Sequence, residues 1–292
     1  MNEVIRQLAA RRSVRAFEDR DIPGEVRAAI LEAAAQAPTA GNQQLYTILD
    51  VTDPQLKARL AETCDHQPFI AQAPMVLIFL ADVCKWLDAY REAGCEPRAP
   101  GAGDVMLAAS DAAIAAQNAV TAAWSLGVGS CYIGDVMERC EEHREMLNLP
   151  PHVFPAAMLV LGYPTEQQAR RPKPERFNMA DIVCKNVYRR KDGPALRRMF
   201  AGRCGTRGYD AWMDAFCRRK YDSDFSREMT RSVEAYLRDY GLVRAEDGGE
   251  DGRPGAPERG GAGVSGCGRT VRRGGGARAD SSAPGAPGAR RA

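Results

Sequence analysis

The stretch RRSVRAF occupies residues 11–17, and the rest of the chain is organised around it. Just upstream, Val4, Ile5 and Leu8 are spaced to cover one face of a short amphipathic helix, so the stretch lies where that helix ends. Arginine presents a planar fork of donors that matches phosphate oxygens two at a time, and Ser13 adds a small donor. The stretch therefore predicts an anion site or, taken alone, a solvated basic helix end that complements the helix dipole.

The composition is that of an ordinary soluble globular chain, with 292 residues of which 45% are hydrophobic and 27% are charged. This length allows one large domain or two small ones. The formal net charge of +2 excludes a polyanion binder that acts through overall charge.

The cysteines and histidines do not form a recognisable framework. Nine cysteines are scattered singly with no C-x-x-C pair, which argues against a disulfide-rich fold. The three histidines show no ligand spacing, so we expect no metal site. We find no signal peptide and no apolar run of the roughly 18 residues that span a bilayer. We therefore expect a reduced, cytoplasmic protein with no membrane partner.

Helices alternate with buried strands along the body of the chain, which predicts a fold with both. Continuous apolar runs at residues 75–81 and 154–161 predict two fully buried strands, and residues 45–51 predict a third. The predicted helices cover residues 24–36, 53–62, 104–126, 136–147 and 225–240. The helix over residues 104–126 is rich in alanine, so we expect it to be central and closely packed by other elements.

The glycines of GVGSCYIGD, residues 127–135, permit tight backbone geometry after the long helix, and the simplest interpretation of this stretch is a helix C-cap and turn. Its last residue, Asp135, is predicted to cap the helix over residues 136–147.

The C-terminal part of the chain differs from the rest. From residue 244 onward there is no Leu, Ile, Phe, Tyr, Trp or Lys, and nine arginines face six acidic residues. Such a segment cannot bury enough apolar surface to offset the entropy of ordering it. We therefore predict one domain over residues 1–243 and a disordered tail over residues 244–292.

Four motifs occur in order: RRSVRAF, then APTAGNQQ at residues 37–44, then LGVGSCYIGD at residues 126–135, and RPKPERF at residues 171–177. A dinucleotide-binding G-x-G-x-x-G and a Walker A sequence are missing. This order of motifs resembles the nitroreductase family of FMN-dependent oxidoreductases, over residues 1–188 and more weakly to about residue 241. The resemblance implies an α+β three-layer sandwich in which helices flank a central mixed sheet, assembled as an intertwined homodimer with FMN at the interface.

The resemblance also implies which residues bind FMN. The phosphate and ribityl contacts fall on Arg11, Arg12, Ser13, Lys173 and Arg176. The flavin pyrimidine contact falls on Arg15, where a cation would stabilise the negative charge of the reduced ring.

Two further segments are implied to approach the flavin ring. The loop that reaches the flavin from the partner subunit falls on Pro38, Thr39, Ala40, Asn42 and Gln44. The backbone N–H that faces flavin N5 falls near Ile133 and Gly134.

The implied activity is an NAD(P)H-dependent FMN oxidoreductase with a ping-pong scheme. Hydride passes from NADH or NADPH to flavin N5 and then to a small organic acceptor such as a nitroaromatic or a quinone. Flavin N5 carries this chemistry, so no catalytic side chain is expected. Reductive dehalogenation or flavin fragmentation on the same fold stays open as an alternative. A nucleic-acid-associated role for the tail is disfavoured, because the tail has no aromatic side chain to stack on bases.

Overall fold

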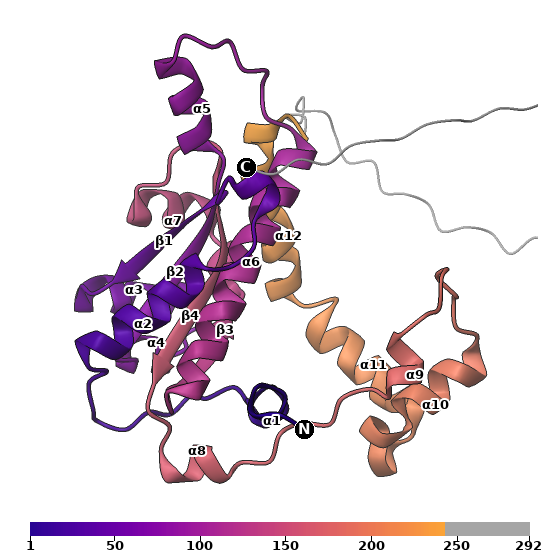
Figure 1. Cartoon of the computed structure of the whole chain (residues 1–292). Helices are drawn as coiled ribbons and strands as arrows, with labels where there is room; N and C mark the ends of the chain where they lie inside the picture. The colour runs from indigo at the N-terminus through magenta and orange to yellow at the C-terminus, as the bar shows by residue number, and fades with distance from the viewer. Residues whose placement is uncertain (243–292) are drawn as a thin grey trace, which may run out of the picture. The chain divides into compact units, whose positions relative to one another are not determined.

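The computed structural model describes residues 1–242, and its central element is a four-stranded sheet with the strand order β1-β2-β4-β3 (Figure 1). The strands are β1 Tyr46–Val51, β2 Met75–Asp82, β3 Gly129–Ile133 and β4 Val153–Gly162. All three strand pairs are antiparallel. The sheet was expected to be mixed, and in the described residues its parallel character is limited to one bridge between Ser13 and Ser130.

The described chain also contains α-helices and short 3-10 helices, several of which pack on this sheet. In chain order they are α1 Glu3–Ala10, α2 Gly24–Ala35, η1 Ala40–Asn42, α3 Pro54–Thr63, α4 Phe69–Gln72, α5 Cys84–Glu92, α6 Ala102–Ser125, η2 Asp135–Met137, α7 Cys140–Leu147, α8 Glu166–Arg170, α9 Met179–Ile182, α10 Gly193–Cys204, η3 Gly205–Arg207, α11 Tyr209–Lys220, α12 Asp224–Leu237 and η4 Arg238–Tyr240.

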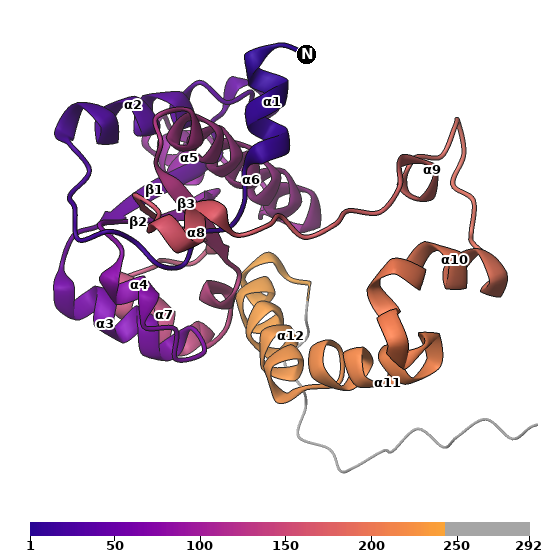
Figure 2. The ribbon, with the colours of Figure 1, turned by 90° about the horizontal axis from the view of Figure 1, so that it is seen from below.

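Strand β2 shows why helices cover both faces of the sheet. Every residue of β2 is buried, and successive side chains point to opposite faces. Met75, Leu77 and Phe79 pack in one hydrophobic cluster with α2 and α6. Val76 and Ile78 pack in a second cluster with α3, α4, α7 and α12. Figure 2 shows α2 and α6 on one side of the sheet and α3, α4 and α7 on the other, so the helix–sheet–helix layering is as predicted.

The omission of a strand at residues 127–135 is wrong, because most of this glycine-rich stretch forms the edge strand β3. The RRSVRAF stretch runs beside this strand, and Val14 N–H donates to the Ser130 carbonyl at 3.0 Å. Val14 is fully buried there, and a Cβ on Gly129 would lie 2.6 Å from its Cγ2 atom. Glycine at this position therefore serves close packing between two backbones rather than a turn.

The predicted continuous helix over residues 136–147 is also wrong. The segment forms η2 and α7, and Arg139 lies between them with a left-handed φ of 49°. Asp135 begins η2, where no side-chain cap is formed. The first turn of α7 is capped from a distant helix, an arrangement that local sequence patterns do not report.

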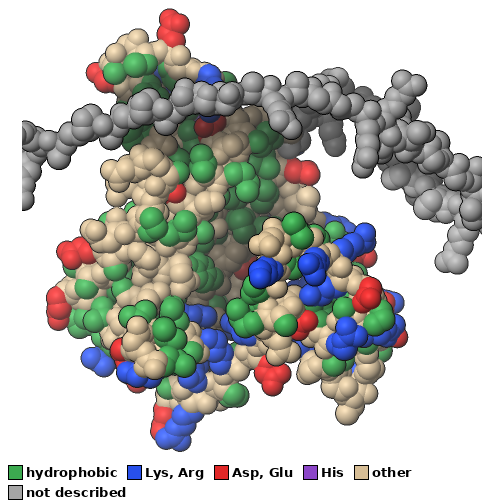
Figure 3. All heavy atoms as spheres, turned by 45° about the vertical axis from the view of Figure 1, so that its right-hand side comes forward, with side chains coloured by type: hydrophobic (Ala, Val, Ile, Leu, Met, Phe, Trp, Pro, Cys, Tyr) green, Lys and Arg blue, Asp and Glu red, His purple; other side chains and the backbone are tan. Residues whose placement is uncertain are grey.

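Residues 171–223, which we call the helical arm, contain α9, α10 and α11. Aromatic rings within the arm pack on one another: Phe177 on Phe200 at 5.0 Å between ring centroids, and Trp212 on Phe216 at 4.8 Å. The arm carries 14 arginines and lysines against six acidic residues. Figure 3 shows basic side chains gathered on this part of the surface.

Within residues 1–242, no helix combines the length and the hydropathy needed to cross a bilayer. The predicted tail, residues 244–292, lies outside the described residues, so the domain boundary at residue 243 stays a prediction.

Candidate functional site

The two basic stretches predicted to hold a phosphate meet in one cavity of about 160 Å³, which we call the cationic cradle. Its lining consists of Arg11, Arg12, Ser13, Arg15, Arg171, Pro172, Lys173, Pro174 and Arg176. The structure thus brings together all six residues that the sequence assigns to the phosphate, ribityl and pyrimidine contacts, although about half of the chain separates the two stretches.

Each basic stretch holds the other in place. The Arg12 guanidinium donates to the carbonyl oxygens of Ala169, at 3.0 Å, and Arg171. Lys173 Nζ donates to the carbonyl oxygens of Leu8 and Ala9 at 3.2 and 2.8 Å, and these are orphan acceptors at the C-terminal end of α1. In the described structure Arg12 therefore ties the two walls of the cradle together.

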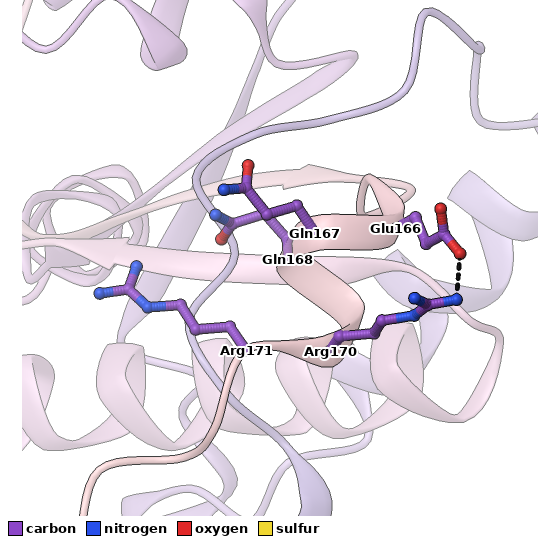
Figure 4. Close-up of a pocket in the computed structure, with 5 residues that line it drawn as sticks. All are labelled: Glu166, Gln167, Gln168, Arg170 and Arg171. Carbon is purple, nitrogen blue, oxygen red and sulfur yellow. Dashed lines mark hydrogen bonds and ion pairs between the residues drawn. The ribbon is translucent and has the colours of Figure 1, made fainter.

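Two neighbouring arginines at the C-terminal end of α8 point in opposite directions (Figure 4). Arg170 turns toward Glu166 and pairs with it, whereas Arg171 extends in the opposite direction (Figure 4). Gln168 of the same helix accepts a hydrogen bond from the Arg15 backbone N–H at 3.3 Å. Glu166, Gln167, Gln168, Arg170 and Arg171 also line an open cavity of about 610 Å³, and Arg171 lines the cradle as well.

The cradle has an excess of positive charge. Burial, and then the charges of Arg11, Arg176 and Arg12, lower the pKa of Lys173. Arg11, Arg15 and Arg176 form no ion pair with any described residue. Cations gathered in this way without acidic partners favour a multiply charged anion, and a phosphate monoester supplies one.

Cys131 of β3 lies behind the cradle and is 1% exposed. Burial raises the pKa of its thiol, against the opposing effects of Arg15 and Ser13. The thiol is the weakly nucleophilic form of cysteine, so the surroundings do not prepare Cys131 for covalent catalysis.

The predicted flavin loop, residues 38–44, has an unusual backbone. Gly41, Asn42 and Gln44 have left-handed φ angles of 57°, 56° and 49°. The Thr39 hydroxyl oxygen accepts a hydrogen bond from Gln44 N–H at 2.8 Å. A non-glycine residue in this region costs conformational energy, so surrounding contacts must hold the loop in shape.

Asp111 of α6 is the main contact that holds the loop. Its two carboxylate oxygens accept the backbone N–H groups of Ala40 at 3.0 Å and Leu45 at 3.2 Å, one at each end of the loop. Asp111 is 3% exposed. The sequence analysis missed this residue, although its helical spacing from the buried alanines at 108, 112 and 115 was a usable signal.

The other predicted segments do not line the cradle of the same chain. Neither the loop at residues 38–44 nor Ile133 and Gly134 belongs to its lining. Ile133 ends β3, three residues beyond the bridge between Ser13 and Ser130. Within one described chain, the cradle and β3 are neighbours through the bridge between Ser13 and Ser130, and the loop is not part of the cradle lining.

Comparisons with known proteins find similar sequences and a similar solved structure. The sequence model described as the nitroreductase family matches residues 8–163. The chain is 31% identical to a Bacillus subtilis protein named FMN reductase (NAD(P)H) over 81% of this chain and 91% of that protein. It is 33% identical to an oxygen-insensitive NADPH nitroreductase of Salmonella typhimurium over 68% of this chain and 80% of that protein. The solved structure of NfrA2 from B. megaterium superimposes with a TM-score of 0.71 at 29% identity, covering 82% of this chain and 98% of that one.

Proposed function

Because the chain belongs to the nitroreductase family, we propose that it is an FMN-dependent oxidoreductase that passes hydride from NADH or NADPH to a small organic acceptor. The observation that carries the proposal is the cationic cradle, in which two basic stretches distant in sequence surround one small cavity. Relatives named for FMN and NAD(P)H support the same cofactor and donor. We propose nitroaromatics and quinones as the classes of acceptor.

The residues of the cradle suit the phosphate end of FMN. Arg11 and Arg176 can each offer a fork of donors to phosphate oxygens, and Ser13 offers a hydroxyl. Arg12 and Lys173 already donate to backbone carbonyls, so we assign them to shaping the cradle and to its positive potential. Arg15 is exposed at the rim, where its guanidinium can reach the ring rather than the phosphate.

When bound, the flavin supplies the centre that accepts hydride and then returns it, which fits a ping-pong scheme with donor and acceptor in the same pocket. The chain contributes binding and orientation. The charge of Arg15 would stabilise negative charge on a reduced flavin ring. The backbone near Ile133 and Gly134 would offer an N–H to the reacting edge of the ring, and the loop at residues 38–44 of the partner subunit would contact the ring.

We further propose that the protein is a homodimer whose sites are shared, because the loop and the cradle of one chain do not meet. Exposed apolar side chains on α1 and α6, among them Ile5, Leu8, Met106 and Ile114, offer a surface that a second copy would cover. The arm is strongly basic, whereas residues 1–170 and 224–242 carry 17 basic against 26 acidic side chains. Association between two copies can bring these opposite charges together.

The first test of the function uses the purified full-length protein. We expect a yellow protein with flavin absorbance, release of FMN on acid denaturation, and anaerobic bleaching when NADH or NADPH is added. Reoxidation by a panel of quinones, nitroaromatics and halophenols then identifies the acceptor class. A colourless protein that takes up no added FMN would refute the proposed function.

The shared site is tested with hybrid dimers. One chain carries Arg11→Ala with Arg15→Ala in the cradle, and the other carries Asn42→Ala with Gln44→Ala in the loop. If the loop acts across the interface, the hybrid has one intact site and binds about half as much FMN as the wild type, while each parent binds little. A hybrid that binds no more FMN than its parents shows that the loop acts within its own chain. In a separate measurement, a mass of 31.8 kDa by light scattering, that of one chain, rules out the dimer.

A further inference from the structure

The junction between β3 and α7 depends on a helix that comes much later in the chain. Helix α7 follows Arg139, which has a left-handed backbone and no side-chain oxygen to cap the helix. The first N–H groups of a helix lack internal partners and need acceptors from outside. Here α12 provides them. Arg139 N–H donates to Glu228 Oε1 at 3.1 Å, and Cys140 N–H donates to Ser232 Oγ at 2.9 Å.

Further contacts make α12 and this junction one unit. The Ser232 hydroxyl donates to the Met137 carbonyl of η2 at 2.7 Å, and Ser232 is fully buried. Arg231 donates to both carboxylate oxygens of Glu141 in α7, at 3.0 and 2.9 Å, and also to Glu228. The Arg231 hydrogen bonds lower the pKa of Glu228, which keeps this acceptor ionised.

Glu138 lies at the centre of the same junction. It is 7% exposed, and among the described residues its Oε1 atom has no hydrogen-bond partner. Burial raises the pKa of Glu138 to about 7, and the charges of Asp135, Asp65 and Glu228 act in the same direction, against Arg139. Titratable and charged groups face this junction from the turn after α3, from η2, from the break before α7, and from α7, α11 and α12. They are Cys64, Asp65, Asp135, Arg139, His143, Lys220 and Glu228.

We propose that Glu228 and Ser232 are positioning residues that hold the backbone of Ile133 and Gly134 in place through η2 and α7, and that a charge on Glu138 weakens this hold. Ser232 contacts Met137 and Cys140, and Glu228 contacts Arg139, so both residues act on the break between η2 and α7 that follows β3 along the chain. The inference rests on the proposed function where it takes this backbone to be the part that faces the flavin. The capping itself does not depend on any cofactor.

The direction of the pH effect follows from the raised pKa of Glu138. Below about pH 4.5, its usual value, the carboxyl is protonated in the folded and in the unfolded chain. As the pH rises through about 7, the folded junction must accept a buried negative charge beside Asp135 and Glu228. Stability at the junction is therefore lost between about pH 4.5 and 7, and the junction is looser at pH 8 than at pH 6.

Hydrogen–deuterium exchange on the full-length protein without added flavin tests the capping. We expect Ser232→Ala and Glu228→Ala to speed exchange over residues 133–142 by about tenfold, while β2 stays unchanged. Glu228→Gln keeps an acceptor oxygen and gives a smaller increase. Thr230→Ala and Glu234→Ala are matched controls on exposed positions of the same helix. Exchange that is equal in the capping and control variants overturns the proposal, whether or not FMN binds.

The FMN-loaded proteins test the positioning. We expect Ser232→Ala and Glu228→Ala to slow flavin reduction by NADPH and to shift the absorbance maxima of bound flavin, with Glu228→Gln between them and the wild type. Faster exchange with unchanged flavin spectra and reduction rates overturns the positioning role. A wild-type chain that binds no FMN refutes the proposed function instead, and exchange still decides the capping.

The role of Glu138 is tested with Glu138→Gln, which has the same shape and no charge. After correction for intrinsic exchange rates, the wild type is expected to exchange faster over residues 133–142 at pH 8 than at pH 6, and the variant is not. The same pH dependence in both proteins would overturn the part assigned to Glu138.

Discussion

The double variant Arg11→Ala/Arg15→Ala is expected to fold normally and to bind FMN at least about a hundredfold more weakly than the wild type. Each charge-assisted hydrogen bond to an anion contributes about 1.5–3 kcal/mol, and the variant removes two cations from the cradle. Folding is not expected to suffer, because neither guanidinium has an ion pair among the described residues. The Arg15 backbone keeps its bond to Gln168 in the variant.

The measurement is a fluorescence titration of the apoprotein with FMN, together with circular dichroism to monitor folding. Arg6→Ala is the matched control, because Arg6 lies one turn earlier on α1 and its ion pair is with the exposed Glu3. Arg12→Ala provides a contrast. Loss of its bonds to Ala169 and Arg171 is expected to weaken the cradle and the stability of the protein together. An FMN affinity in the double variant equal to that of Arg6→Ala would show that the cradle is not the phosphate site.

Asp111→Ala is expected to lower the free energy of unfolding by about 2–6 kcal/mol and to abolish flavin loading. The substitution leaves the N–H groups of Ala40 and Leu45 without acceptors, and each buried unsatisfied donor costs about 1–3 kcal/mol. The strained backbone at Gly41, Asn42 and Gln44 then loses the contact that maintains it. The Asp111 side chain is buried and holds the loop at residues 38–44, so its loss is expected to affect both the stability of the fold and the loop.

Denaturation by urea, followed by fluorescence, measures the effect. Asp111→Asn retains one acceptor oxygen but places a donor against the second N–H, so we expect it to be intermediate. Ser110→Ala is the control, since Ser110 is exposed on the same helix and its hydroxyl bonds to the Met106 carbonyl. The three variants should follow the order Asp111→Ala, Asp111→Asn, Ser110→Ala in decreasing effect. If Asp111→Ala were as stable as Ser110→Ala, the loop would be held by other contacts.

Local patterns predicted much of this fold. The buried strands at residues 75–81 and 154–161 and the long alanine-rich helix are found as β2, β4 and α6, because their length and apolar periodicity left few alternatives. Strand β3 escaped prediction because it is short and rich in small residues. Among them, Gly129 allows the close approach of Val14, a contact that no pattern within residues 127–135 reveals.

The candidate site was predictable from residue chemistry together with the family resemblance. The RRSVRAF stretch indicated an anion, the resemblance added Lys173 and Arg176, and the fold brings both stretches into one cavity. Residues that act through geometry were harder to find. In the sequence, Asp111 is marked only as an acidic residue among the alanines of a helix. The break between η2 and α7 at Arg139 depends on hydrogen-bond acceptors that lie 89 and 92 residues further along the chain.

The capping of α7 by α12 has a consequence for the order in which the protein forms during synthesis. A ribosome releases the chain from its N-terminus, and domains begin to fold as they emerge. The four strands and the cradle residues are all complete by residue 176, whereas Glu228 and Ser232 emerge more than 50 residues later. A nascent chain can therefore assemble its sheet while the segment after β3 still lacks its acceptors. A chain truncated before residue 228 is therefore expected to form the sheet but to leave the backbone at Arg139 and Cys140 without these acceptors.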